Sequence, residues 1–379
     1  MASTSVPRHN HTPCLTLDNL SSLLWLPLPV AWSLPLITLA TSASSLSISF
    51  PSFLSISSLP RPLLYTLSIA LVYTLLHALC ALNDRVAWGG GAQRRRKIRW
   101  AEEVVVVTGG AGGLGSLLVK GLGMMGARVA CLDVVGEGED GEGGDEEGDV
   151  KFYRCDVGDL ESVTRVAERI HGDLGVPTVL INNAAIVNGQ PLLSLSPEAI
   201  ERNFRVNLLS HFHTIRTFLP DMLSRPEGGT IVTVSSVLGH LGPARLSDYA
   251  AAKAGLTAVH ASLRAEIDAL AVSASNAHRG AKNTRMILVK PGQLSTQMFD
   301  SIDTPSSFFG PVVQGVDLAG AVIEAIESGR DGVISMPLYA RYIEWMGILP
   351  YGLQRVARWM SGVDRAMTGF SAPKQEITR

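Results

Sequence analysis

From residue 104 onward, short apolar runs alternate with longer amphipathic stretches. Continuous, branched runs typical of buried parallel strands occur at Val104–Val107, Ala127–Val134, Thr178–Ile181, Thr230–Val234 and Met286–Val289. Longer stretches with helical periodicity separate them, at Leu160–His171, Pro197–Phe218 and Tyr249–Leu270. This alternation predicts an α/β domain, a Rossmann-like doubly wound parallel sheet with helices on both faces.

The N-terminal region has a different pattern, because the 65 residues from Asn19 to Asn83 carry one charge, Arg61. One apolar stretch, 20–40, contains three prolines, whereas Leu63–Leu82 has no charge and no proline. As a helix, the second stretch would be roughly 30 Å long, the thickness of a bilayer core. We therefore expect N-terminal hydrophobic membrane helices, crossing once or twice. A buried core helix of a soluble domain is the alternative interpretation.

A basic run, Gln93–Arg99, follows the second apolar stretch. Basic residues beside a membrane span favour the cytosolic side, although a solvated linker without a topological role has the same composition. The pattern divides the chain into an anchor region (1–92), a basic linker (93–103), an α/β domain (104–337) and an apolar C-terminal extension (338–379). Within the domain, the acidic, glycine-rich segment 136–149 is expected to be a solvated loop.

Charge and cysteine content narrow the classes of partner. The net charge is −2, so nothing indicates a nucleic-acid partner. The four cysteines form no CxxC motif and no metal-like pairing with histidine. We expect no metal site and no disulfide scaffold.

A glycine-rich turn, Thr108–Gly115, follows the first predicted strand and leads into a helix beginning near Leu114. Glycines at such a turn allow the backbone to approach a pyrophosphate, whose charge meets the amides of the helix N-terminus. Asp133 ends the second predicted strand, where a carboxylate can bind the adenosine ribose hydroxyls and repel a 2′-phosphate. Together these features favour NAD over NADP. The alternatives are a tight turn without a ligand and an ordinary strand-end aspartate.

Tyr249 and Lys253 are four residues apart, on one face of a predicted helix. An ammonium group near a phenol lowers the pKa of the phenol, which suits an acid or base in alcohol–carbonyl interconversion. Ser236 lies thirteen residues upstream at a strand end, and Asn207 lies in the preceding helical pattern. A surface Tyr–Lys pair without a chemical role is the alternative.

In these motifs the chain resembles the short-chain dehydrogenase/reductase family, over roughly 104–337. The family's TGxxxGxG turn is matched at 108–115, its adenine-contacting Asp–Val pair at 156–157, and its NNAG strand end at 182–185, with alanine as the last residue. The resemblance implies a catalytic set consisting of Asn207, Ser236, Tyr249 and Lys253. It also implies a nicotinamide cofactor, bound by Gly109, Gly113, Leu114, Gly115, Asp133, Asp156, Val157, Asn183, Ala184, Tyr249, Lys253, Pro291, Gly292 and Thr296.

The apolar segment Gln293–Gly315 would form the substrate lid in this family. The anchor, the core motifs and the apolar tail together resemble the membrane-anchored branch that contains retinol dehydrogenases and lipid-droplet 17β-hydroxysteroid dehydrogenases. This narrower resemblance implies a retinoid, steroid or long-chain alcohol as substrate, and an endoplasmic reticulum or lipid-droplet membrane as location. A homodimer is expected from family analogy alone. Two alternatives are an NADPH-dependent ketone reductase of the same fold and a catalytically vestigial membrane scaffold.

Overall fold

The computed structural model describes residues 37–38, 61–87, 96–135, 149–273, 276–296, 298 and 310–366. The chain divides into two units, Leu17–Gln93 and a larger unit that contains Arg94–Arg379. Most of the apolar stretch 20–40, the acidic segment except Asp149, most of the expected lid (297 and 299–309) and the tail from 367 lie outside the described residues.

In the smaller unit, helix α3 (Arg61–Ala87) contains the stretch Leu63–Leu82, so the helix expected there is present. Its hydroxyl side chains bond to carbonyls one turn earlier, as Ser68 does to Leu64 at 2.8 Å. Across the described residues, no helix is both long enough and apolar enough to cross a membrane. The span expected at Leu63–Leu82 is therefore not confirmed.

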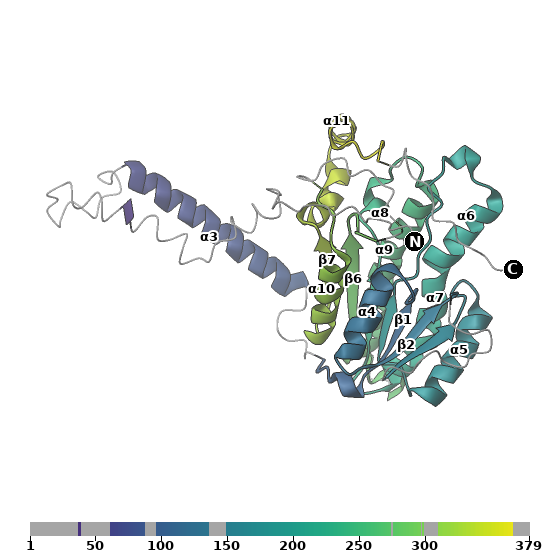
Figure 1. Cartoon of the computed structure of the whole chain (residues 1–379). Helices are drawn as coiled ribbons and strands as arrows, with labels where there is room; N and C mark the ends of the chain where they lie inside the picture. Colours follow the sequence, from purple (N-terminus) through teal and green to yellow (C-terminus); the bar gives the residue numbers. More distant parts are fainter. Residues whose placement is uncertain are drawn as a thin grey trace, which may run out of the picture. The chain divides into compact units, whose positions relative to one another are not determined.

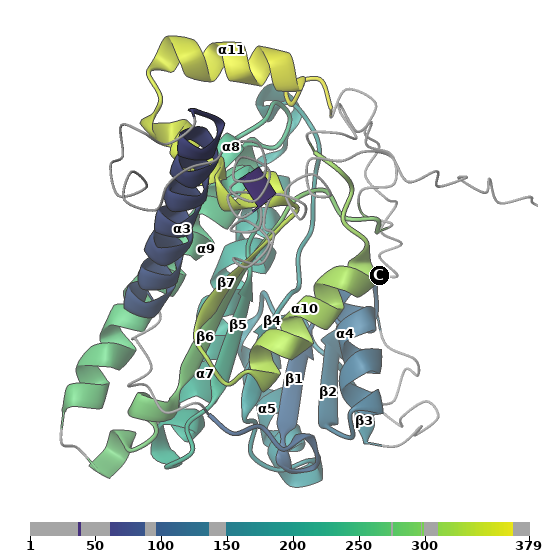
Figure 2. The same ribbon diagram turned by 90° about the vertical axis from the view of Figure 1, so that its left-hand side faces the viewer.

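The larger unit is built on a seven-stranded sheet with the order β3-β2-β1-β4-β5-β6-β7 (Figure 2). The strands are β1 (Val104–Thr108), β2 (Arg128–Asp133), β3 (Val150–Arg154), β4 (Val179–Asn182), β5 (Thr230–Val234), β6 (Arg285–Pro291) and β7 (Gly332–Met336). Every neighbouring pair is parallel. The Rossmann-like sheet predicted from the sequence is confirmed, with two additional strands, β3 and β7, at its edges.

Helices cover both faces of this sheet (Figures 1 and 2). The first layer holds α4 (Gly113–Met124) and α10 (Gly315–Glu327); the second holds α5 (Leu160–Asp173), α7 (Ser210–Ser224) and α9 (Ser247–Val272). Val105 and Val107 of β1 are buried in the first layer, whereas Val104 and Val106 are buried in the second. A strand buried on both faces explains the continuous apolar run, and each such side chain contributes about 1.5–3 kcal/mol through burial.

The helix predicted over Pro197–Phe218 is interrupted in its middle. It consists of α6 (Pro197–Phe204), a π-helical turn (Arg205–Leu209) and α7, which continues to Ser224. Asn207, in the π turn, uses its side chain to bond both backbone groups of Ile186. These long-range bonds hold the wider turn in place, and periodicity alone does not reveal them.

Residues 96–103, which the charge pattern assigned to a linker, contribute buried side chains to the domain. The Arg96 guanidinium lies 2.5 Å from the Glu103 carboxylate, and both side chains are buried. Arg96 also donates to Thr230 in β5, and its amide bonds to Gly329. Trp100 in the following short helix is buried in the first core layer.

Three short helices follow β7. They are η9 (Leu338–Arg341), η10 (Ile343–Ile348) and α11 (Tyr351–Ser361). Ala340 and Ile343 are buried in one cluster with Val237, which directly follows Ser236. The first part of the C-terminal extension therefore packs beside the loop that carries Ser236.

Candidate active site

The glycine-rich turn lies between β1 and α4 and is closed on one side. Gly109 has φ +63°, and a Cβ there would lie 2.8 Å from the Cα of Ala184. A Cβ on Gly115 would meet the carbonyl oxygen of Gly109 at 1.9 Å. At Gly112, in contrast, a Cβ would have no neighbour within 4 Å. The turn thus presents open backbone at the N-terminus of α4, which fits a pyrophosphate. Leu114, in the first turn of α4, points into the core.

Asp133 lies beside this turn, as predicted. Its carboxylate accepts a hydrogen bond from the Ala111 amide at 3.0 Å and another from the Val134 amide at 2.8 Å. The amides of Gly109 and Gly110 bond to the carbonyl of Leu132, just before it. These bonds join the end of β2 to the glycine-rich turn, with a carboxylate at the position expected for the adenosine ribose.

Sequence reasoning missed Arg154, the last residue of β3. In the parallel register it is the Cα partner of Asp133, so the two side chains project to the same face of the sheet. Arg154 is exposed. Because β3 was not predicted and is separated from β2 by the acidic segment, no local signal could have placed this cation beside Asp133.

The residues that follow β3 and β4 make up the next part of the site. The Thr108 hydroxyl accepts hydrogen bonds from the amides of Asn183 and Ala184 at 3.0 and 3.1 Å. The Asn183 side chain donates to the carbonyls of Thr108 and Gly109. After β3, the Asp156 carboxylate accepts from Gly158 at 2.9 Å, and Val157 is buried. The residues expected around the adenine and pyrophosphate therefore lie at one edge of the sheet.

Ser236, Tyr249 and Lys253 meet at the end of β5. The Tyr249 hydroxyl is hydrogen-bonded to Ser236. The ammonium nitrogen of Lys253 lies 5.6 Å from the centroid of the Tyr249 ring and donates to the Val234 carbonyl at 2.8 Å. All three side chains are buried. The helical spacing of Tyr249 and Lys253 in α9 produces this pairing.

Burial controls the protonation of this group. It lowers the pKa of Lys253 to about 7, and it raises the pKa of the Tyr249 phenol well above its ordinary value. The hydrogen bond from Ser236 acts in the opposite direction on Tyr249 but is the smaller effect. The lowering of the phenol pKa that the nearby ammonium was expected to cause is not found, because burial raises that pKa. The phenol is protonated at neutral pH.

Asn207 is buried in the π turn, which packs against α9. Its carboxamide accepts from the Ile186 amide and donates to the Ile186 carbonyl, both at 2.8 Å, and donates to Asn203 at 2.9 Å. These bonds tie the π turn to the loop that follows β4. Asn207 thus fixes the backbone at Ile186, in the loop that follows β4.

Two histidines were not singled out from the sequence: the buried His211, near Lys253, and the half-buried His260. Burial and the nearby charge of Lys253 lower the pKa of His211 well below its ordinary value. Burial lowers the pKa of His260 to about 4, and its Nδ1 lies 3.1 Å from the Thr233 hydroxyl. Both imidazoles are therefore neutral at pH 7. Isolated histidines on helices carry no sequence signal for such a position.

The third part of the site follows β6. The Pro291 carbonyl accepts from the amide of Val237, and Gly292 donates to the Met336 carbonyl at 2.7 Å. A Cβ on Gly292 would lie 2.5 Å from the Tyr339 hydroxyl, so glycine is needed for that close approach. Thr296 lies near the glycine-rich turn, 3.8 Å from where a Cβ on Gly113 would stand. Thr296, after β6, therefore approaches the turn that follows β1.

The sequence comparisons agree with this geometry. A profile of the short chain dehydrogenase family matches residues 103–304. An uncharacterised oxidoreductase of Saccharomyces cerevisiae is 29% identical over 303 residues, covering 79% of this chain and 89% of that protein. Retinol dehydrogenase 10-A of Danio rerio is 32% identical over 305 residues, covering 73% of this chain and 87% of the relative.

A solved structure shows the same fold. The crystal structure of a short chain dehydrogenase from Burkholderia cenocepacia in complex with NADP is 28% identical, with a TM-score of 0.54, and covers 69% of this chain and 99% of that one. The open backbone at the glycine-rich turn and the matched motifs also fit a nicotinamide dinucleotide. The chain therefore belongs to the short-chain dehydrogenase/reductase family, as an NAD(P)-dependent oxidoreductase related to the retinol dehydrogenases.

Proposed function

We propose that this protein is a membrane-associated oxidoreductase that transfers a hydride between NAD and a lipophilic alcohol or ketone. The observation that carries the proposal is that Ser236, Tyr249 and Lys253 lie together at the end of β5. A phenol, a hydroxyl and an ammonium group beside one another suit proton transfer to or from a substrate oxygen.

Each of these residues has a distinct role in the proposed reaction. The bound nicotinamide supplies hydride transfer at its C4 position. Tyr249 exchanges the hydroxyl proton with the substrate, and Ser236 hydrogen-bonds the substrate oxygen as charge develops there. Lys253, whose pKa is about 7, stabilises the Tyr249 phenolate that accepts the substrate proton during alcohol oxidation, and it would bind the nicotinamide ribose. Asn207 holds the loop after β4 in position and orders a water for the proton's path to solvent.

The preference for NAD rests on Asp133. Its carboxylate stands at the glycine-rich turn, where it accepts hydrogen bonds from amides. The ribose hydroxyls can donate to this carboxylate as well, whereas a 2′-phosphate would be repelled by its negative charge. NAD is usually kept oxidised in cells, so alcohol oxidation is the proposed direction.

A second candidate, an NADPH-dependent ketone reductase, is favoured by Arg154. This cation shares a face and a register position with Asp133, and a guanidinium binds phosphate well. The related Burkholderia structure is in complex with NADP. The two candidates differ in the group at the 2′ position of the adenosine ribose. If Asp133 dominates, a hydroxyl is preferred; if Arg154 dominates, a phosphate is preferred.

The proposed substrate is a retinoid, a steroid or a long-chain alcohol. The two ends of the expected lid segment lie side by side. The amide of Ser295 donates to the carbonyl of Val313 at 3.0 Å, and Leu294 and Val313 are both buried. Leu294 and Val313, near the two ends of the lid segment, therefore belong to the first core layer. Relatives named retinol dehydrogenases also support a lipophilic substrate.

Attachment to the cytosolic face of the endoplasmic reticulum or of lipid droplets is also part of the proposal. Its support is the low charge of Asn19–Asn83 and the exposed apolar side chains of α3, such as Ile69 and Leu79. A bilayer would concentrate an apolar substrate beside the enzyme. A homodimer remains part of the proposal by family analogy.

The test is turnover by membranes that contain the full chain. They are supplied with NAD or NADP and with retinol, a hydroxysteroid or a long-chain alcohol, and the Lys253→Met variant is run in parallel. NAD-linked oxidation that disappears in the variant is the expected result. Faster turnover with NADP would favour the second candidate. Absence of turnover with every substrate and both cofactors, in a chain that still localises normally, would favour the vestigial scaffold.

A further inference from the structure

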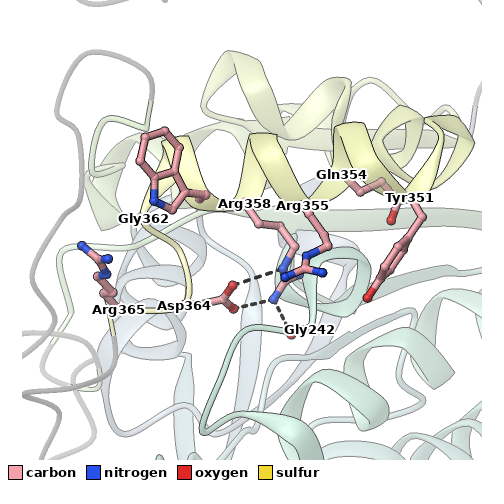
Figure 3. A pocket seen from close by; sticks show the side chains of 9 residues that line it. Gly242, Tyr351, Gln354, Arg355, Arg358, Gly362, Asp364 and Arg365 are labelled. Carbon is pink, nitrogen blue, oxygen red and sulfur yellow. Dashed lines mark hydrogen bonds and ion pairs between the residues drawn. The ribbon is translucent and has the colours of Figure 1, made fainter.

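Helix α11 directs its polar face toward the domain. The guanidinium of Arg358 donates to the carbonyls of Leu241 and Gly242, at 3.1 Å to the latter, and pairs with Asp364. Figure 3 shows Arg358, Arg355 and Tyr351 on the side of the helix that faces the Gly242 loop. Together with that loop they line a polar cavity of about 750 Å³.

The opposite face of α11 is apolar and exposed. Leu353, Val356 and Met360 recur at helical spacing and form one arc, and Trp359 lies at the edge of that arc, where it also borders the cavity. Their side chains are 54%, 51%, 74% and 75% exposed, and Ile348, just before the helix, is 80% exposed. An amphipathic helix normally buries its apolar arc against the core. Here the arrangement is reversed, and a continuous exposed apolar patch of this kind marks an interaction surface.

We propose that this face, formed by Leu353, Val356, Trp359 and Met360 and here called the α11 face, docks on the surface of an anionic lipid bilayer. Its side chains are those of an interfacial helix, with tryptophan among aliphatic groups. Side chains of this length reach the boundary between headgroups and acyl chains without spanning the membrane.

Charge around the α11 face agrees with a lipid partner. Segment 338–366 contains four arginines, at 341, 355, 358 and 365, and two acids, Glu344 and Asp364. Both acids are already paired, with Lys290 and Arg358 respectively. The segment is therefore positive in a chain whose net charge is −2, and it complements anionic headgroups.

Docking would bring the bilayer close to the proposed site. Gly242 is the residue after α8 (Leu238–Leu241), and α8 begins two residues after Ser236. The Arg358 contacts thus link α11 to the loop that follows the serine. This consequence rests on the proposed function, whereas the docking itself does not.

The test follows a polarity-sensitive fluorophore on the full chain. It is attached at Met360→Cys on the α11 face, at Gln354→Cys on the polar face, or at Met124→Cys on the exposed end of α4. Cys14 and Cys80 are replaced by serine, while the buried Cys131 and Cys155 are retained. Each protein is mixed with phosphatidylcholine vesicles, with and without phosphatidylserine. Quenching by lipids brominated in their acyl chains reports depth.

The proposal predicts a blue shift at 360 on addition of phosphatidylserine vesicles, and several-fold stronger brominated-lipid quenching at 360 than at 354 or 124. If vesicles bind the chain but the probe at 360 shows the same emission wavelength and the same weak quenching as the probe at 124, the proposal is wrong and attachment occurs elsewhere. A probe at 360 that is buried without lipid, in a concentration-dependent manner, would overturn it in favour of a second copy. Because fluorescence and not turnover is measured, failure here leaves the proposed reaction untouched.

Discussion

The carboxylate of Asp133 accepts a hydrogen bond from the amide of Ala111 at 3.0 Å, which joins the end of β2 to the glycine-rich turn. The second oxygen of the same carboxylate is held by the amides of Val134 and Val135. The side chain is therefore fixed before any cofactor arrives. A preorganised carboxylate of this kind loses little entropy on binding the ribose hydroxyls.

Replacing Asp133 with serine is expected to shift cofactor preference. Loss of a charged acceptor that bonds the ribose should weaken NAD binding about tenfold or more, and loss of the negative charge should strengthen NADP binding. Dissociation constants for both cofactors, measured by calorimetry, check this. Arg154→Ala serves as the matched variant and should weaken only NADP. Unchanged NAD affinity in Asp133→Ser would contradict the assignment.

Lys290 and Glu344 join β6 to η10 at 2.5 Å. The Lys290 side chain is buried whereas Glu344 is half-exposed, so Glu344→Gln leaves a buried ammonium without its countercharge. The expected loss in free energy of unfolding is about 1–2 kcal/mol after allowing for solvent screening. Chemical denaturation measures it. The double variant Lys290→Met, Glu344→Gln should regain most of the loss, and an equal or larger loss would show that the pair is not the cause.

Arg96 and Glu103 form a pair that is buried on both sides. Arg96→Met should lower the free energy of unfolding by about 3–5 kcal/mol, because it leaves the Glu103 carboxylate buried and unpaired. Arg99→Met is the control, since the ion pair of Arg99 with Glu102 is exposed and should matter by less than about 1 kcal/mol. Equal effects of the two substitutions on denaturant midpoints would mean that 96–103 is a linker after all.

Acid should destabilise the domain through His260, because the pKa of this histidine is lowered in the folded chain. The pKa of His260 is about 4 in the folded chain, against an ordinary value of 6.5, so the unfolded chain binds this proton more readily between those values. The stability that depends on neutral His260 is complete above pH 6.5 and is lost as the pH falls toward 4. In His260→Gln, the loss between about pH 7 and about pH 4.5 should shrink by roughly 2 kcal/mol. An unchanged pH dependence would argue against it.

Local patterns in the sequence were enough to predict the centre of the fold and the pairing of Tyr249 with Lys253. The run Val104–Val107 is buried on both faces, which its unbroken apolar character indicated. The spacing of Tyr249 and Lys253 placed both on one side of α9. In contrast, β3 was missed, because at the sheet edge only Tyr153 of its five residues is buried and no apolar run results.

Features that depend on long-range contacts were not predictable. The π turn at Asn207 exists because its side chain bonds Ile186, which is 21 residues away. Arg96 looked like part of a solvated basic run, yet its charge is neutralised by Glu103 and its backbone is fixed by Gly329. The outward apolar face of α11 follows from the bonds of Arg358 to the Gly242 loop. None of these partners is adjacent in sequence.

The most direct test of the account is single-turnover oxidation of the preferred alcohol by the full chain and by Tyr249→Phe. Loss of the Tyr249 hydroxyl, which takes up the substrate proton, should slow hydride transfer about a hundredfold to ten-thousandfold while the affinity for NADH is unchanged. Tyr153→Phe is the control, because its hydroxyl bonds Asp173 and not a residue of the proposed site. A rate in Tyr249→Phe within a few-fold of that in Tyr153→Phe would contradict the role proposed for Tyr249 and, with it, the proposed mechanism.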